Sequence, residues 1–229
     1  MAQLDLPTVT LLCADCYDVE RVIPVIEHCK SLCNFGAVKL LTSLDTNHPD
    51  KVKINPLPSH IAYSVFMLKR APTYVSTEHA LVVQHDGWIL NPDAWNPAWL
   101  ALDYVGPLFI HKHVIQPTSV GSGGFSLRSK KLMDFVNGRL PEWVETPQGT
   151  EQMQFMLGSY EDGIISIKHR HELVSAGFKY ATPSEAAKFA QGGNCDPAYY
   201  VPRPFGFHGL WGNIDLDTGV VGPWVDRGC

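Results

Sequence analysis

The amino-acid sequence predicts an α/β fold in which helices cover both faces of a mainly parallel central sheet. An apolar run at residues 7–13 is followed by a helical pattern over about residues 19–33 and by a second apolar run at residues 37–43. The apolar residues in these runs are nearly continuous, which is typical of parallel strands that are buried on both faces. The order strand, helix, strand predicts a right-handed crossover between parallel neighbours.

The rest of the chain continues this pattern. After a proline-rich passage, residues 60–71 have the pattern of a helix and residues 80–84 that of another buried strand. A glycine-rich stretch at residues 121–124 leads into a further helix, and another helix is predicted near residues 150–158. A tail rich in glycine, proline and aromatic residues follows. The length of 229 residues and the lack of a clear linker predict a single domain.

Composition and charge narrow the class of protein. Hydrophobic residues make up 45% and charged residues 18% of the chain, as in ordinary globular proteins. The formal net charge of −5 argues against broad electrostatic capture of nucleic acid. No apolar run approaches the roughly 20 residues that span a bilayer, and the amino terminus lacks the features of a signal peptide. We therefore expect a cytoplasmic protein without a membrane span.

Four of the six cysteines fall early in the chain, and two interpretations compete for them. They are Cys13, Cys16, Cys29 and Cys33. Their C-x2-C-x12-C-x3-C spacing is compatible with a structural zinc site in an interaction protein. However, Cys29 and Cys33 also continue a helical apolar spacing that begins at Val22, and Cys13 extends an apolar strand. Because free cysteine behaves as a small buried hydrophobe, the core interpretation is preferred.

Ligands in parallel sheets collect at the carboxyl ends of the strands. Three segments follow the predicted strands directly, at residues 13–18, 41–45 and 84–87. The first contains Asp15, which we expect among the ligand-binding residues.

The third segment, Gln84-His85-Asp86-Gly87, has the residue types of a metal site. Side chains two apart on a strand point to the same side, so Gln84 and Asp86 are expected to project together from the strand end. Gly87 allows a ligand to approach the backbone closely. A hard divalent cation prefers oxygen ligands, and Mg²⁺ is often held by one or two carboxylates plus substrate phosphates. The alternative is an aspartate that caps a turn at a strand end.

A histidine near the carboxyl end of the chain is a candidate for a second metal ligand. His208 lies between glycines and aromatic residues in the segment from Pro204 to Leu210. The alternative is a partly buried histidine whose hydrogen bonds are all satisfied within the fold. Among the other nine histidines, only His85 is a candidate for testing.

Two further segments are candidates for the same site, one for binding an anion and one for supplying a general base. Gly-rich turns can hold anionic groups on exposed amides, and residues 121–124 form such a stretch before Lys130 and Lys131. Glu161 and Asp162 form an adjacent acid pair that could supply a general base. Each also has a structural interpretation, as a tight turn and as a solvated helix end.

Taken together, these segments resemble a bacterial and viral family of predicted GT-A-like glycosyltransferases. The resemblance spans roughly residues 8–211, in order and at plausible spacing. It is carried by the segments YSVFMLK from Tyr63, VQHDGWILNP from Val83, DYVG from Asp103, the stretch from Val120 to Ser129, Glu161-Asp162 and PFGFHG from Pro204.

The resemblance implies a single GT-A-type Rossmann-like domain, with a nucleotide-sugar half at about residues 1–110 and an acceptor and catalytic half at about residues 111–229. It implies a nucleotide-diphosphate-sugar donor that lies across the strand ends, and Mn²⁺ or Mg²⁺ as cofactor. The metal would be held by Asp86, as in the DxD element of such enzymes, and by His208.

The resemblance also implies roles for residues around the donor. Asp162 would be the catalytic base, with Glu161 beside it. The stretch from Gly123 to Arg128, which contains Gly124, would shape the sugar and acceptor pocket. Lys69 could contact a phosphate. The reaction would be an inverting transfer in which the metal stabilises the leaving nucleoside diphosphate.

One departure from the family pattern keeps other functions open. Gln84 stands where a DxD element has its first acid, which leaves room for a metal-independent transfer helped by Lys69 or Arg128. It also favours the alternative of a sugar-nucleotide-binding module that has lost catalysis. A nucleotidyltransferase is a further alternative, although no glycine-rich triphosphate loop follows the first strand.

The acceptor is open at this level. Cell-surface glycans, protein side chains and small molecules are all compatible with the residues. A hydroxymethylated DNA base of a phage is also compatible, because the resembling family has viral members; such a protein would act in the host cytoplasm.

Overall fold

The structure is a computed structural model. It describes residues 3–108, 120–144, 160–192, 197–209, 214–215 and 219–221, with the side chains of 140–144, 197, 214–215 and 221 outside the description. The helix expected near residues 150–158 lies outside the described residues.

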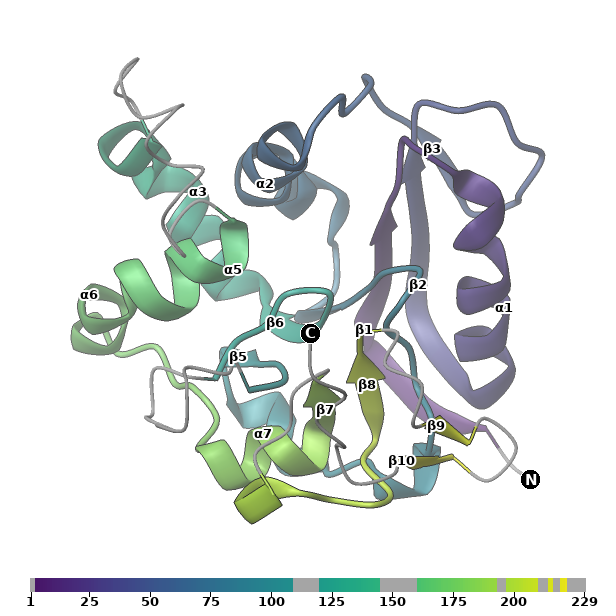
Figure 1. Cartoon of the computed structure of the whole chain (residues 1–229). Coiled ribbons are helices and arrows are strands. Elements are labelled where there is room, and N and C mark those ends of the chain that lie inside the picture. Colours follow the sequence, from purple (N-terminus) through teal and green to yellow (C-terminus); the bar gives the residue numbers. More distant parts are fainter. Residues whose placement is uncertain are drawn as a thin grey trace, which may run out of the picture.

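A six-stranded sheet forms the centre of the molecule, with the strand order β3-β2-β1-β4-β6-β5 (Figure 1). Its strands are β1 (Leu4–Ala14), β2 (Cys33–Thr42), β3 (Lys51–Lys53), β4 (His79–Val83), β5 (Tyr104–Val105) and β6 (Phe125–Ser129). The first four in this order pair in parallel, and β6 runs antiparallel to both β4 and β5. The prediction of a mainly parallel α/β sheet is therefore confirmed.

Helices cover both faces of the sheet, as predicted. Figure 1 shows α1 on one side and α2 and α3 on the other. The α-helices are α1 (Ile23–Leu32), α2 (His60–Lys69), α3 (Lys130–Val144), α5 (Glu161–Gly163), α6 (Arg170–Ser175) and α7 (Pro183–Phe189). A π-helical segment, η7 (Ile164–Lys168), links α5 to α6, and the 3₁₀ turns are η1 (Val19–Arg21), η2 (Ala71–Tyr74), η3 (Pro92–Ala94), η4 (Pro97–Ala101) and η8 (Pro197–Tyr199).

The alternation of side chains along β1 explains the layers. Leu11 and Cys13 belong to the core cluster that includes α1, whereas Leu12 and Ala14 belong to the cluster under α2. Successive residues of a strand point to opposite faces, so a strand that is apolar throughout requires cover on both. Four short strands lie outside the main sheet: β7 (Ala190–Gly192), β8 (Gly206–His208), β9 (Ile214–Asp215) and β10 (Val220–Val221).

Local signals set where several helices begin. The Ser59 hydroxyl accepts a hydrogen bond from the Ala62 amide and caps α2. Thr182 and Glu185 form a reciprocal capping box at the start of α7. These side chains satisfy backbone N–H groups that have no partner within the helix.

Two expected boundaries were wrong. Cys33 does not end the first helix; it begins β2, where it is still buried in the core. The glycine-rich stretch at residues 121–124 does not lead directly into a helix, because the antiparallel strand β6 comes between this stretch and α3. Because β6 is antiparallel to β4, its first residue Phe125 pairs with Val83, the last residue of β4. The residues before β6 therefore lie beside the residues that follow β4.

Within the described residues, no helix is both long enough and apolar enough to cross a lipid bilayer.

Candidate active site

The segment from Gln84 to Gly87 forms a tight turn at the end of β4. The Gly87 amide donates to the Gln84 carbonyl at 3.1 Å, and the Gln84 amide donates to the Gly87 carbonyl at 3.4 Å. β4 ends at Val83, one residue before the end expected at Gln84, so Gln84 and Asp86 belong to the turn and not to the strand. The turn reverses the chain and presents Asp86 at its tip.

The residues after this turn pair with β8, which brings His208 to Asp86. The Phe207 amide donates to the Trp88 carbonyl, and the Gly209 amide donates to the Asp86 carbonyl at 2.7 Å. As a result, His208 Nε2 lies 3.6 Å from Asp86 Oδ1. The two predicted metal ligands, which are far apart in the sequence, therefore meet at one point.

The atoms of this pair fit a divalent cation. Asp86 Oδ1 is buried and accepts no hydrogen bond from any described residue, which is costly for a carboxylate oxygen without a further partner. Burial lowers the pKa of His208, which favours the neutral imidazole that binds metals. Two ligands of one ion at about 2.1 Å each lie about 3–4 Å apart. His85 Nδ1 also lies 3.8 Å from Asp86 Oδ1.

Gly124 allows these side chains to approach the backbone. A Cβ atom on Gly124 would lie 2.6 Å from Gln84 Oε1, and closer still to His208 Nε2. Any larger residue at this position would displace His208 or Gln84, so the site requires glycine here. A Cβ atom on Gly87 would also lie close to this histidine, at 3.2 Å from its Cδ2.

The adjacent residue, Gly123, holds the second candidate group. Its amide donates to Asp162 Oδ2 at 2.8 Å, and the Gly163 amide donates to Asp162 Oδ1 at 2.7 Å. The Asp162 carboxylate is therefore fixed by two backbone donors at the start of α5. The Gly123-Gly124 segment thus connects Asp162 to the Asp86–His208 pair.

Glu161 and Arg128 form a buried ion pair beneath this segment. Arg128 Nη2 lies 3.1 Å from Glu161 Oε1, and the two side chains are 1% and 5% exposed. Arg128 Nη2 also donates to the Gly123 carbonyl, and Ser64 Oγ donates to Glu161 Oε2. Both oxygens of Glu161 thus have partners, and the pair supports the backbone that carries Asp162.

The surroundings of the Asp162 carboxyl group shift its pKa toward neutral pH. Burial, and after it the nearby Glu161 carboxylate, raise the pKa of Asp162, which comes to about 7. The two backbone donors and the Arg128 charge act in the opposite direction. A carboxyl group with a pKa near the working pH is suited to take a proton from a reacting hydroxyl.

Replacing this carboxyl group is expected to change how stability depends on pH. The unfolded Asp162 side chain ionises near 3.8, and the folded one near 7, so the folded protein loses stability as pH rises between these values. Asp162→Asn removes that loss. We expect the variant to gain about 1–3 kcal/mol relative to the wild type at pH 8, compared with pH 4. Thermal unfolding at both pH values measures this difference, and an equal effect at both would contradict the raised pKa.

Asp15 lies at the end of β1 but is engaged by its own loop. Its carboxylate accepts hydrogen bonds from the amides of Tyr17 and Asp18 and from the Arg21 guanidinium. These bonds fix the turn between β1 and α1. A role for Asp15 in donor binding stays a prediction.

Lys69 lies on α2 but on a different side of the helix from Tyr63, which contacts Gln84. It is the last residue of this helix and lies about 9 Å further along the axis than Tyr63. Lys69 makes no ion pair with any residue that the structure describes. Its expected contact with a phosphate also stays a prediction.

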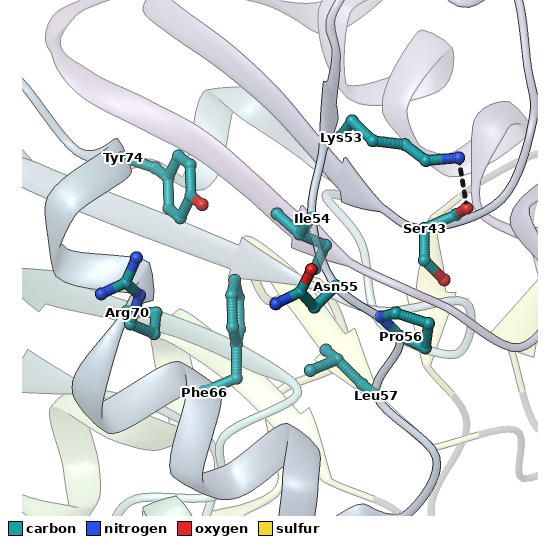
Figure 2. A pocket seen from close by; sticks show the side chains of 9 residues that line it. All are labelled: Ser43, Lys53, Ile54, Asn55, Pro56, Leu57, Phe66, Arg70 and Tyr74. Carbon is teal, nitrogen blue, oxygen red and sulfur yellow. Dashed lines mark hydrogen bonds between the residues drawn. The ribbon is translucent and has the colours of Figure 1, made fainter.

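A groove of about 500 Å³ lies beside α2 and borders the carboxyl ends of β2 and β3. Figure 2 shows Phe66, Arg70 and Tyr74 on one side and Ile54 toward the other. Arg70 forms no ion pair within the described part of the chain. Tyr63, Phe66 and Arg70 follow the i, i+3, i+7 spacing of one helix face, so the groove continues the face that reaches Gln84. Its lining suits a flat ligand that carries negative charge.

Three of the four early cysteines lie in the apolar core. Cys13, Cys29 and Cys33 are buried, and Cys16 is partly buried. Burial raises the pKa of Cys29 to about 12, which disfavours the thiolate that binds zinc. The core interpretation is confirmed for Cys13, Cys29 and Cys33.

One other cluster in the described residues has metal-ligand spacing, namely Glu27, His48 and Asp50. Lys30 contacts both carboxylates of this cluster at 2.8 Å. A lysine therefore supplies the positive charge at this surface position.

Three residues with clear roles were not assigned any from the sequence. Tyr63 accepts a hydrogen bond from Gln84, Ser122 binds the second nitrogen of His208, and Ser64 binds Glu161. Tyr63 and Ser64 are adjacent on α2, and both contact the site because of the way in which this helix packs against it. Nothing in the local sequence indicates that arrangement.

Comparisons with known proteins agree with this fold. A family model described as "Protein of unknown function (DUF5672)" matches residues 49–208, and the chain belongs to this family. The matched region contains the Asp86–His208 pair and Asp162. Comparison with curated protein sequences gave no significant match.

Two of the solved structures that match this chain are those of glycosyltransferases. A glycosyltransferase involved in glycosylation of the major capsid of PBCV-1 is 14% identical, with a TM-score of 0.52 over 89% of this chain and 93% of that one. A mannosyltransferase from Pyrobaculum calidifontis, solved with GDP-Man and Mn²⁺, is 11% identical, with a TM-score of 0.46 over 80% of this chain and 58% of that one. The fold of this protein is therefore the GT-A fold.

Proposed function

We propose that the protein is a glycosyltransferase that moves a sugar from a nucleotide-diphosphate sugar to an acceptor hydroxyl. The observation that carries this proposal is the Gly123-Gly124 segment. The Gly123 amide binds the Asp162 carboxylate. Gly124 lies against His208, which in turn neighbours Asp86. A proton acceptor and a candidate metal site at adjacent residues suit a reaction in which a diphosphate leaves while a hydroxyl attacks.

Asp86 and His208 would hold the divalent cation, Mn²⁺ or Mg²⁺. When bound, such an ion supplies positive charge that stabilises a leaving diphosphate. The buried, unpaired Asp86 Oδ1 and the nearby His208 Nε2 support this assignment. Gly87 and Gly124 keep the space beside these atoms free of side chains.

Asp162 would act as the general base of an inverting transfer. Its carboxylate takes the proton of the acceptor hydroxyl while the acceptor oxygen forms a bond to the anomeric carbon. The bond from that carbon to the diphosphate oxygen breaks, and its electron pair leaves with the diphosphate. The pKa of Asp162 near 7 and its two backbone donors support this role.

Glu161 and Arg128 would act as positioning residues rather than in contact with substrate. Both are buried, and each is bonded to the other or to the backbone of Gly123. The negative charge of Glu161 also contributes to the raised pKa of Asp162. Of the two adjacent acids, Glu161 would therefore position the site and Asp162 would take the proton.

Incubation with a panel of nucleotide-diphosphate sugars, with and without Mn²⁺, tests this proposal. Thermal stabilisation reports binding, and release of free nucleoside diphosphate reports turnover. We expect one donor to raise the melting temperature only with the metal, with slow hydrolysis of the donor to follow. Binding without any release would favour the inactive binding module that Gln84 suggests. No response to any donor would contradict the proposal.

A further inference from the structure

The side chain of Gln84 is held in one orientation beside the Asp86–His208 pair. Its Nε2 donates to the hydroxyl of Tyr63, a residue of α2, at 2.9 Å. An amide carries nitrogen and oxygen on opposite sides of one carbon, so this bond directs Oε1 the other way. Oε1 lies on the Gly124 side, within 2.6 Å of the point that a Cβ on Gly124 would occupy.

The same point adjoins His208, so His208 Nε2 has the Gln84 oxygen and the Asp86 carboxylate as neighbours. His208 Nε2 lies still closer to that position than Gln84 Oε1 does, and Asp86 Oδ1 lies 3.6 Å from Nε2. The amide oxygen, the carboxylate oxygen and the imidazole nitrogen all accept a cation, and none of them offers a proton to another when His208 is neutral at Nε2. Neutral amide oxygens are ordinary ligands of hard cations.

A second hydrogen bond fixes the histidine in the same manner. Ser122 Oγ lies 2.9 Å from His208 Nδ1, which leaves Nε2 directed at Asp86. When the ring donates from Nδ1 to this hydroxyl, the lone pair of Nε2 is available to a metal. Partners of this kind commonly orient metal-binding histidines.

We propose that Gln84 is a third protein ligand of the divalent cation, through Oε1, and that Tyr63 is the positioning residue that selects this oxygen. The inference rests on the proposed function, because it presumes that Asp86 and His208 hold a metal. It changes the meaning of the glutamine at the first position of the Gln-x-Asp segment. Gln84 does not remove the metal site but supplies a neutral oxygen, which lowers the negative charge around the ion by one.

Titration with Mn²⁺ alone, followed by the electron paramagnetic resonance signal of free Mn²⁺, measures the affinity directly. We expect Gln84→Ala and the similarly sized Gln84→Leu to weaken Mn²⁺ binding by about 10-fold or more. Gln84→Glu is expected to keep or strengthen binding, because a carboxylate is a better ligand for a hard cation. The nitrogen modulation from His208 in the pulsed spectrum should persist in all three variants and shows that the rest of the site is intact.

Tyr63→Phe tests the positioning role through a double-mutant cycle. With Gln84 present, loss of the hydroxyl lets the amide turn, and we expect Mn²⁺ affinity to fall by about 3- to 10-fold. In the Gln84→Glu background the two carboxylate oxygens are equivalent, so the same change should alter affinity by less than about twofold. A purely structural effect of Tyr63 would be equal in both backgrounds, and that result would overturn the positioning role.

The outcomes separate this inference from the proposed function. Unchanged Mn²⁺ affinity in Gln84→Ala and Gln84→Leu, with binding intact in the wild type, would overturn the third ligand alone. A wild-type protein that binds no Mn²⁺ would overturn both the third ligand and the metal role of Asp86.

Discussion

Asp162→Asn is expected to lower the rate of sugar transfer by about 10²- to 10⁴-fold, while the affinity for the donor changes by less than about twofold. The asparagine side chain has nearly the same shape and keeps one of the two bonds from the Gly123 and Gly163 amides, but it cannot take a proton at neutral pH. Single-turnover rates and donor titrations on the same preparation separate the two effects.

Asp134→Asn is the matched control for this variant. Asp134 is an acid on α3 whose exposed side chain pairs with Lys130 of the same helix. Its replacement should leave both transfer and donor binding unchanged. If Asp162→Asn instead loses donor binding, Asp162 belongs to the nucleotide site and the assignment as base is wrong.

Asp86→Ala is expected to weaken Mn²⁺ binding by about 100-fold or more and to abolish the metal-dependent part of donor binding. The change removes the one carboxylate of the candidate metal site and leaves His208 without its neighbour. Calorimetric titration with Mn²⁺, and then with donor in the presence of Mn²⁺, measures both steps.

Asp93→Ala provides the comparison for Asp86→Ala. Asp93 is an exposed acid in η3, seven residues after Asp86. The Asp93→Ala change removes one negative charge, as Asp86→Ala does, from a residue outside the candidate site. Turnover that survives in Asp86→Ala with a chelator present would show that the transfer needs no metal.

The central layers of the fold could be predicted from the sequence because their signals are local. An almost entirely apolar β1 requires cover on both faces, and the apolar spacing of the first helix supplies one cover. The antiparallel strand β6 was missed because a short strand followed directly by a helix gives no separate apolar period. The ends of elements were also less certain, as Cys33 illustrates.

The candidate site could be predicted as a list of residues but not as a geometry. Asp86, Asp162 and His208 stand out by residue type and by their glycine neighbours. The approach of His208 to Asp86 depends on the pairing of β8 with the residues after Gly87, and the position of Asp162 depends on its bond to the Gly123 amide, neither of which a local pattern specifies. The burial of Arg128 against Glu161 was likewise not evident, because an arginine in a glycine-rich stretch resembles a surface residue.

The late return of β8 to the turn after β4 has a consequence for when the candidate site can form during synthesis. Asp86 leaves the ribosome in the first half of the chain and can enter the early parallel layer. The histidine beside it is added only when most of the polypeptide has emerged, and contacts so distant along the chain close slowly. A nascent chain that has folded β1 to β4 would therefore hold the Asp86 carboxylate without His208, and the candidate site would be completed in one late step.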